Sequence, residues 1–357
     1  MALNAVSCSA PPREHPGTSR VPPPLGAQML GLPADAADTG RLPSHPAEPL
    51  AGKRLVFLIG APRSGTTWLQ LLLSRSPRIA TANETHLFNG YLSSLFSTWD
   101  LHRRNIRALG LHHLLSECEY FQFIRDFATT VMLRIAAQKP DADILLEKTP
   151  GHVLHWQDII RIFPDAAFLH IVRDPRSVVA SLCAAADGWG AQWTSREALI
   201  NCETWIEYIR ASRSLSAATD NFLQVGYRDL WENGPQTLRS VFAWLGVEIG
   251  IEECGAMLDQ CRIGNLRAHR LPDAPWDLAA EPAEFYRAGG TETWRSELTA
   301  REIYLVEHLT RELMRELGFA AGARRKIILP LIVASRLRHA IAWRRNARKA
   351  KTDAARH

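Results

Sequence analysis

Short apolar runs along the chain alternate with longer segments in which apolar residues recur every three or four positions. The short runs are rich in β-branched residues, which is typical of strands buried on both faces, and the longer segments predict helices. Strands that alternate with helices indicate a mostly parallel β-sheet with helices on both faces, an α/β fold. The predicted strands cover 55–59, 79–83, 143–148, 167–173 and 222–227.

Helical periodicity fills the intervals between these runs. A leucine-rich helix follows the first strand, and Asp174 followed by Pro175 is typical of a helix N-terminus. Residues 262–292 are irregular and rich in Pro, Gly and Arg, which predicts a functional lid. One helical face within 90–138 is predicted to hold Phe121, Ile124, Phe127, Val131 and Ile135. Further helices are predicted over 153–163, 174–186, 196–217, 235–245 and 297–317.

Composition divides the chain of 357 residues into three parts. Residues 1–50 are rich in Pro, Gly and Ala without periodicity, which predicts a disordered leader, with a targeting role as the alternative. Residues 51–320 hold all the predicted strands and are expected to form one domain. Residues 321–357 are predicted to form a basic amphipathic tail, because eleven Lys or Arg and one acidic residue follow position 323. Such a tail can lie on an anionic membrane surface or stay solvated and disordered.

Overall composition excludes several classes of protein. The hydrophobic share of 46% and the charged share of 22% are those of a globular protein. The net charge of +5 is concentrated in the tail, so no nucleic-acid partner is expected for the mildly acidic body. Six cysteines without a CxxC pair indicate a reducing compartment, and no ligand pattern predicts a metal. Without an 18-residue apolar run or a signal-peptide core, we expect a cytoplasmic protein.

The segment between the first strand and its helix has the sequence Gly-Ala-Pro-Arg-Ser-Gly-Thr-Thr at 60–67. A strand, a glycine-bounded loop and a helix N-terminus form the architecture that binds a phosphate. Its two glycines have the Walker A spacing, but Thr66 stands where a Walker A loop has lysine. This loop is therefore predicted to bind an anion other than a triphosphate. Its expected contacts come from Pro62, Arg63, Ser64, Gly65, Thr66, Thr67 and Trp68.

A second anion site is predicted where Arg173 ends the fourth strand and Ser181 lies two turns into the next helix. Glu84, Lys148 and Tyr227 also follow predicted strands. Ligands of open α/β sheets bind beyond the carboxyl ends of the strands. We therefore expect all these residues to meet in one site.

The two motifs together resemble the sulfotransferase family that uses 3′-phosphoadenosine 5′-phosphosulfate (PAPS). In that family Pro-Arg-Ser-Gly-Thr-Thr-Trp is the 5′-phosphosulfate loop, and strand-Arg-Asp-Pro-Arg-x-x-x-x-Ser is the 3′-phosphate site. A donor with phosphate groups at both ends of its ribose explains the two sites and the absent lysine. The resemblance covers roughly 53–318 and implies a sulfotransferase domain over 51–320, with a P-loop-like parallel sheet flanked by helices.

Two further segments are similar to those of the family. Residues 225–233 resemble its Val-x-Tyr-Glu-Asp-Leu-x-x-Asn segment, which implies that Tyr227 contacts the nucleotide, although Arg228 replaces the usual glutamate. Gly289-Gly290 followed by Trp294 and Arg295 is similar to the segment that closes over the 3′-phosphate and adenine.

Catalytic roles follow from the same resemblance. Glu84 is similar to the glutamate base of the branches that sulfate tyrosine or glycans, here in a bacterial-type soluble member. His152 is the second candidate base, because cytosolic small-molecule branches use a histidine after the third strand. Lys148 is similar to the lysine that assists the leaving group, and Arg63 is expected to stabilise the sulfuryl group in transfer.

The predicted reaction is sulfuryl transfer from PAPS to a hydroxyl of a carbohydrate, glycolipid or other metabolite. One alternative is a nucleotide kinase or NTPase with a degenerate Walker A loop, and another is a non-catalytic nucleotide-binding module. Trp189, Trp193 and Trp205 have the spacing of core aromatics, with an acceptor pocket as the alternative.

Overall fold

The computed structural model describes residues 50–105, 110–282, 284–287, 289–322, 330 and 332–341. The predicted leader, except for Leu50, and most of the predicted tail lie outside the described residues. No helix within these ranges combines the length and the apolar composition that crossing a membrane requires.

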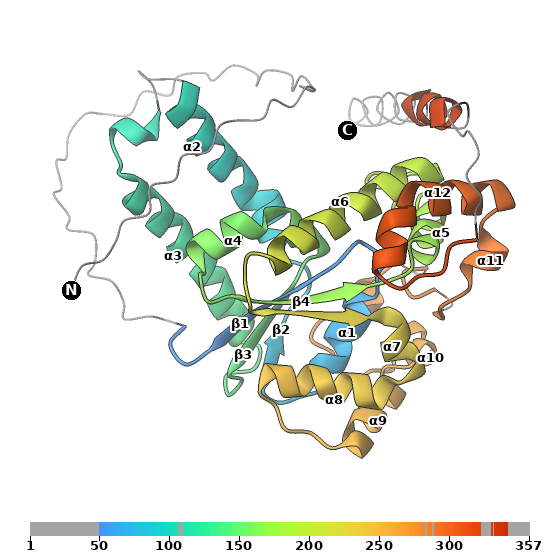
Figure 1. Cartoon of the computed structure of the whole chain (residues 1–357). Coiled ribbons are helices and arrows are strands. Elements are labelled where there is room, and N and C mark those ends of the chain that lie inside the picture. The colour runs from blue at the N-terminus through green and yellow to red at the C-terminus, as the bar shows by residue number, and fades with distance from the viewer. Residues whose placement is uncertain are drawn as a thin grey trace, which may run out of the picture. The chain divides into compact units, whose positions relative to one another are not determined.

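Five parallel strands form one sheet in the order β2-β3-β1-β4-β5 (Figure 1). The predicted α/β fold is therefore confirmed. The central strand β1 pairs with β3 on one side and β4 on the other, so the chain order reverses at its carboxyl end. This switch point is where ligands bind in open α/β sheets. The strands are β1 (Arg54–Ile59), β2 (Ile79–Thr81), β3 (Ile144–Lys148), β4 (Ala167–Val172) and β5 (Phe222–Gly226).

Helices follow each strand, and short 3₁₀ or π turns (η) lie between some of them. Their bounds are α1 (Thr66–Leu73), η1 (Leu87–Leu92), α2 (Ser93–Asn105), η2 (Leu111–His113), α3 (Glu117–Ala136), η3 (Pro150–His155), α4 (Trp156–Ile162), α5 (Pro175–Ala185), α6 (Ala198–Ser216), α7 (Tyr227–Glu232), α8 (Gly234–Leu245), α9 (Ile251–Gln260), α10 (Ile263–Arg267), η4 (Leu278–Ala280), α11 (Trp294–Glu297) and α12 (Ala300–Glu316).

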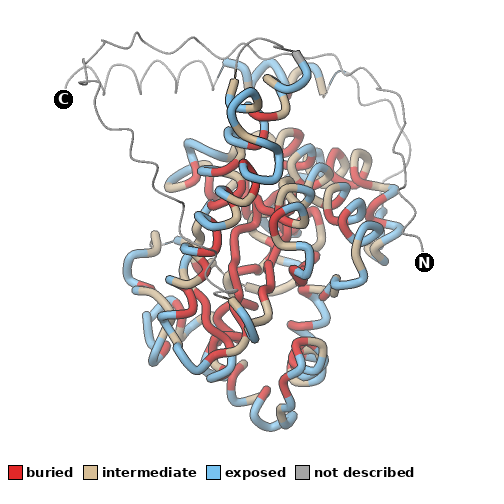
Figure 2. Tube along the Cα trace, turned by 90° about the vertical axis from the view of Figure 1, so that its left-hand side faces the viewer, coloured by how far each residue is buried: buried red, intermediate tan, exposed pale blue. Residues whose placement is uncertain are grey.

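Alternate residues of β1 pack into two different cores. Val56 and Leu58 belong to a cluster with α1, α8 and α9, whereas Phe57 and Ile59 belong to a cluster with α2, α3 and α4. Figure 2 shows the buried residues concentrated along the strands and on the helix faces that cover them. Burial on both faces explains the uninterrupted apolar runs in the sequence.

Three predicted details differ from the structure. Phe127 is exposed, because α3 buries the face that holds Ile124, Ala128 and Met132. The last predicted helix, 297–317, begins at Ala300 as α12, because Thr299 caps it with a capping box, and α11 is a separate turn that ends at Glu297. The irregular segment 262–292 contains α10 and η4.

Candidate active site

A cavity of about 1520 Å³ lies where the loops that follow the strands converge. Most of the predicted site residues line it: Pro62, Arg63, Gly65, Thr66, Thr67, Trp68, Glu84, Arg173, Ser181 and Tyr227. Ser64 and Lys148 are buried beside it, and Lys148 reaches two of its lining residues. His152, Trp294 and Arg295 lie elsewhere, as described below.

Two glycines allow the 60–65 loop to approach its neighbours closely. A Cβ atom on Gly60 would lie 2.7 Å from the Ile171 carbonyl oxygen, and one on Gly65 would lie 2.6 Å from the Tyr227 ring. Gly65 also has a φ of 101°, in the region that side chains disfavour. The loop is thus shaped by contacts with β4 and with the residue after β5.

Arg173 lies at the second predicted anion site with an incompletely satisfied guanidinium. Its two terminal nitrogens donate to the Arg63 carbonyl at 3.1 Å and the Gly290 carbonyl at 2.8 Å. Its Nε is buried without a hydrogen-bond partner among the described residues. Burial lowers the pKa of this guanidinium, which lies 4.1 Å over the Tyr227 ring. A buried cation with an unused donor fits a phosphate group.

Arg63 extends towards Ser181 in the structure. Its Nε donates to Ser181 Oγ at 3.1 Å, and a terminal nitrogen donates to the Phe285 carbonyl at 2.6 Å. Burial, followed by the positive charges of Arg173 and Arg287, lowers the pKa of Arg63 to about 10. The sequence placed Arg63 at the 5′-phosphosulfate, but its guanidinium lies at the predicted 3′-phosphate site.

Arg287, which was not among the predicted site residues, also lines the cavity. It pairs with Glu297 at 2.8 Å. Its position just before the two glycines at 289 and 290 could have identified it. Three arginines from three loops therefore converge on one side of the cavity.

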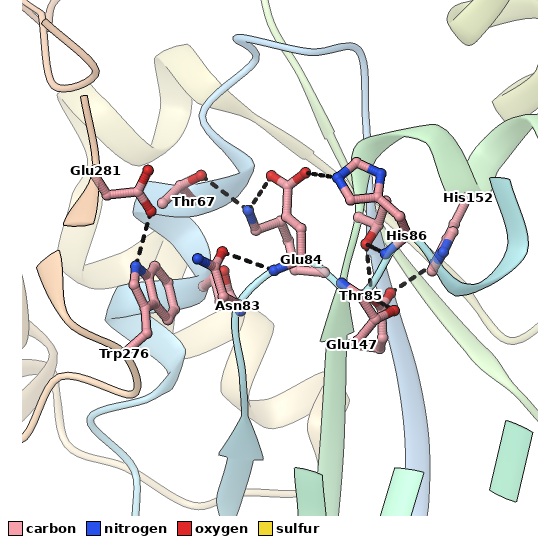
Figure 3. A network of polar contacts seen from close by, with 12 residues as sticks. Thr67, Asn83, Glu84, Thr85, His86, Glu147, His152, Trp276 and Glu281 are labelled. Carbon is pink, nitrogen blue, oxygen red and sulfur yellow. Dashed lines mark hydrogen bonds and ion pairs between the residues drawn. The ribbon is translucent and has the colours of Figure 1, made fainter. Parts of the chain in front are cut away.

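Glu84 and Lys148 meet because β2 and β3 are parallel neighbours. Lys148 Nζ donates to Glu84 Oε1 at 2.5 Å and to Thr67 Oγ1 at 3.2 Å (Figure 3). The Lys148 side chain is only 1% exposed, so Glu84 partners a buried charge. Glu84 Oε2 lies 3.4 Å from His86 Nε2. A carboxylate, an ammonium group and a loop hydroxyl thus form one constellation.

His152, the second candidate base, is fully buried below this constellation. Its Nε2 accepts the Phe88 backbone N–H at 3.1 Å. Its Nδ1 lies 2.7 Å from Glu147 Oε2 (Figure 3). Because both ring nitrogens face protein groups, this histidine does not meet a substrate in the cavity. Of these two candidate bases, Glu84 lines the cavity and His152 does not.

Glu147 connects His152 to the loop that carries Glu84. Its Oε1 accepts from Thr85 Oγ1 at 2.7 Å and from Thr149 Oγ1 at 2.8 Å. Burial alone raises the pKa of Glu147, but His152 and the two hydroxyls outweigh it, so the pKa lies below its ordinary value. This buried network holds residues 85–88 against the end of β3 and so positions Glu84.

Aromatic side chains line the side of the cavity beyond Arg63. Trp189 lies 5.3 Å from both the Trp193 ring and the Phe285 ring, and all three line the cavity. Trp205 is instead buried in the core, with its Nε1 bonded to the Arg173 carbonyl. The alternative of an aromatic pocket thus fits two of the three tryptophans.

Glu281 adds a second carboxylate to the cavity lining. It accepts from Trp276 Nε1 at 3.0 Å, and burial raises its pKa. Figure 3 shows both residues beside Thr67, on the opposite side from His86. The segment 262–292 thus contributes an acidic group as well as Arg287.

Trp294 and Arg295 do not line the cavity, contrary to the prediction. Trp294 is buried in a cluster with α5 and α6 and lies under the Arg176 guanidinium. Arg295 is exposed and pairs with Glu292. The helical turn of α11 directs this pair away, and Arg287 and Gly289 of the same segment line the cavity instead.

Comparison with known proteins places these residues in context. A family model described as "Sulfotransferase family" matches residues 56–251, more than half of the chain. Nodulation protein NoeE of Sinorhizobium fredii is 25% identical over 296 residues, which cover 74% of this chain and 66% of that protein. Protein-tyrosine sulfotransferase 2 of Gallus gallus is 26% identical over 198 residues, covering 54% of this chain and 51% of that protein. The chain thus spans half to two thirds of the length of these relatives.

Among solved structures, a sulfotransferase domain from the curacin biosynthetic pathway has a similar fold. Its TM-score is 0.50 at 16% identity, covering 76% of this chain and 99% of that chain. The matched family region includes the 60–67 loop, Glu84, Lys148, Arg173 and Tyr227.

Proposed function

The chain belongs to the sulfotransferase family, and we propose that it transfers a sulfuryl group from PAPS to a hydroxyl of a carbohydrate, glycolipid or other metabolite. The observation that carries this proposal is the contact of Lys148 with both Glu84 and Thr67. This contact supports the proposal, because a carboxylate that can accept a proton and an ammonium group that can stabilise negative charge meet at the anion loop. Domain bounds of 51–320 and a cytoplasmic location are parts of the same proposal.

The donor half of the cavity is formed by the 60–67 loop, Arg173, Ser181, Arg287 and Tyr227. Two separated anion sites suit a donor with phosphate groups at both ends of its ribose. The unused Arg173 Nε and the buried, unpartnered Ser64 Oγ, judged among the described residues, are available to phosphate oxygens. These contacts are the fit between the chain and PAPS that supports the proposal.

An aromatic pocket that suits a nucleobase lies next to the anion loop. Trp68 lies 5.6 Å from the Tyr227 ring, and the Trp231 ring stacks on Tyr227 at 6.2 Å with an interplanar angle of 17°. All three line the cavity. Flat aromatic faces beside a phosphate site suit a purine, and we assign the adenine of the donor to them.

In the proposed reaction Glu84 accepts the proton of the acceptor hydroxyl. The hydroxyl oxygen forms a bond to sulfur while the bond from sulfur to the 5′-phosphate oxygen breaks. That oxygen leaves with the electron pair, and adenosine 3′,5′-bisphosphate is the second product. The proton, the sulfuryl group and the electron pair are thus all accounted for.

Lys148 has two partners that suit this reaction. Its ammonium group lies between the carboxylate of Glu84 and the hydroxyl of Thr67, so it can shift towards an oxygen that gains charge at the loop. A charge-assisted hydrogen bond contributes about 1.5–3 kcal/mol. Charge stabilisation by fixed donors is the largest contribution that a protein makes to such transfers.

The acceptor half of the cavity is formed by Trp189, Trp193, Phe285, Glu281 and His339, with Glu84 at its border with the donor half. Aromatic walls with a few polar groups are typical of sites that bind small organic molecules. A carboxylate such as Glu281 accepts hydrogen bonds from hydroxyl groups. This combination supports a hydroxyl-bearing amphiphilic acceptor.

Incubation of the protein with labelled PAPS and a total lipid and glycan extract tests the proposal. We expect label in one lipid or glycan fraction, and none with the Glu84→Gln variant. Thermal stabilisation by adenosine 3′,5′-bisphosphate but not by ATP with magnesium separates this function from that of a kinase. Stabilisation without labelling of any fraction would favour a non-catalytic nucleotide-binding module.

A further inference from the structure

A helix over 332–341 docks on the protein body beside the acceptor half of the cavity. Ser335 Oγ donates to Glu197 at 2.5 Å, and Arg338 donates to both oxygens of the same carboxylate at 2.7 and 3.0 Å. His339 Nδ1 lies 3.0 Å from Ser195 Oγ and its side chain lines the cavity. This end of the chain therefore contributes to the wall of the site.

The opposite face of this helix is apolar and exposed. Val333, Leu337 and Ile341 follow one another at intervals of four residues and are 58%, 61% and 46% exposed. Ser335 and His339 lie on the other face, as expected from the helical period. Three large aliphatic side chains in a row thus face away from the protein body.

Trp193 is a second exposed apolar group, near the face of the helix that carries His339. It lines the cavity and is 47% exposed, two residues before the serine that contacts His339. Tryptophan is favoured where one end of a side chain is in an apolar phase and the other in water. Exposed apolar groups therefore lie both on the helix and at the acceptor half of the cavity.

Charge identifies the surface that would cover these groups. Residues 324–357 hold eleven Lys or Arg and one acidic residue, so this part of the chain repels a second copy of itself. Basic residues with exposed aliphatic and aromatic groups complement a bilayer with anionic headgroups.

We propose that the helix over 332–341 and Trp193 form a docking surface for an anionic membrane. Docking places the mouth of the acceptor half at the bilayer. The acceptor is then a membrane-borne amphiphile with a hydroxyl headgroup, such as a glycolipid. This last step rests on the proposed function, whereas membrane binding itself does not.

Vesicle co-sedimentation of the full chain tests the docking surface. We expect binding to vesicles of phosphatidylcholine with phosphatidylglycerol, little binding to phosphatidylcholine alone, and weaker binding at high salt. Leu337→Glu should weaken binding by at least about tenfold, because it removes an aliphatic group and adds a like charge. Leu114→Glu is the matched control, because Leu114 is 81% exposed on a different part of the protein.

Equal vesicle binding by the wild-type protein and the Leu337→Glu variant would overturn the proposal. So would a wild-type dimer that Leu337→Glu converts to monomer without any vesicle binding, since a second copy would then cover the exposed aliphatic side chains. Thermal stabilisation by adenosine 3′,5′-bisphosphate serves as the folding control and should be the same in all three proteins. If adenosine 3′,5′-bisphosphate does not stabilise the wild type, that result counts against the proposed function. The vesicle experiment still tests the docking surface in that case.

Discussion

In the proposed donor half of the cavity most side chains follow the ends of parallel strands, whereas in the proposed acceptor half they come from segments that are distant in the sequence. Arg63 follows β1 and Arg173 follows β4, and these strands are hydrogen-bonded neighbours. Trp189 and His339 reach the acceptor half from the segment after α5 and from the C-terminal helix. The sheet therefore determines donor geometry, and packing of peripheral segments determines acceptor geometry.

This difference indicates which part of the site is held more rigidly. A strand end is fixed by a ladder of backbone hydrogen bonds, so the position of a motif placed there depends on the sheet. The acceptor wall depends on side-chain contacts such as that between Glu197 and Arg338. We therefore expect substitutions in the donor half to change the affinity for the donor and substitutions in the acceptor half to change KM for the acceptor. A substitution at the border between the halves should change kcat.

The largest effect is expected at the border between the halves. Glu84→Gln should lower kcat by about 10²–10⁴-fold, because it removes the proposed base, while binding of adenosine 3′,5′-bisphosphate stays nearly unchanged. Single-turnover assays and calorimetry measure the two quantities. Near-normal turnover in this variant, together with loss of turnover in His152→Ala, would show that the base assignment is wrong.

A large effect on folding stability is expected at the buried network below Glu84. His152→Ala should lower the free energy of unfolding by about 3 kcal/mol, because it leaves the Glu147 carboxylate buried with fewer partners. Urea denaturation measures this change. His155→Ala is the matched control, because His155 is partly exposed and pairs with Asp158 at 3.6 Å. Equal destabilisation by both substitutions would contradict a special role of the network.

The same network predicts a dependence of stability on pH. The folded-state pKa of Glu147 lies below its ordinary value of 4.5, so the unfolded state binds more protons as the pH falls. The stabilisation is thus complete above pH 4.5 and is lost as the pH falls through the folded-state pKa. Denaturation curves measured above and below this pH give the change in the free energy of unfolding with pH. This change should be smaller in Glu147→Gln than in the wild type. An identical change in both proteins would exclude Glu147 as the source.

In the donor half, Arg173→Lys should weaken binding of adenosine 3′,5′-bisphosphate by about tenfold to a hundredfold, since one charge-assisted hydrogen bond contributes about 1.5–3 kcal/mol. The ammonium group of lysine cannot reproduce the three donor positions of the guanidinium. Calorimetry measures the affinity. Arg228→Lys is the control, because Arg228 is exposed and pairs with Glu232. An unchanged affinity of Arg173→Lys would remove Arg173 from the donor site.

The smallest effect is expected in the acceptor half. Trp189→Ala should raise KM for the acceptor by up to about tenfold, since an aromatic contact contributes about 0.5–1.5 kcal/mol, and should leave donor affinity nearly unchanged. Steady-state kinetics with each substrate varied in turn measures both. A change confined to donor affinity would place Trp189 in the donor half and would contradict the division of the cavity into a donor half and an acceptor half.

Local patterns were sufficient to predict the sheet and the donor motifs. The apolar runs predicted all five strands within a few residues, because β1 to β4 are buried along nearly their whole length and such strands are mostly apolar. The 60–67 loop and the Arg173 motif each lie within one strand–loop–helix unit, so their parts are adjacent in the sequence as well as in space. Their assignment to a nucleotide with two anionic ends needed the resemblance to a family.

Other features depended on contacts between distant segments. The sequence did not show that His152 is buried with its ring nitrogens in contact with Glu147 and Phe88, because burial depends on tertiary packing. It also did not show that Trp294 faces the core while Arg287 faces the cavity, since this depends on where α11 begins. Periodicity placed Phe127 on the wrong face because neighbouring apolar residues gave α3 two possible faces.

The sequence by itself determined the parallel α/β sheet, the anion loop and the arginine at the second site, because each arises from residues close together in the chain. Only the tertiary structure decided which carboxylate meets Lys148, which arginines converge and which tryptophans face the cavity. These outcomes depend on the order β2-β3-β1-β4-β5 and on the packing of the lid and the C-terminal helix. Strand order and side-chain burial are set by long-range contacts, which no local pattern contains.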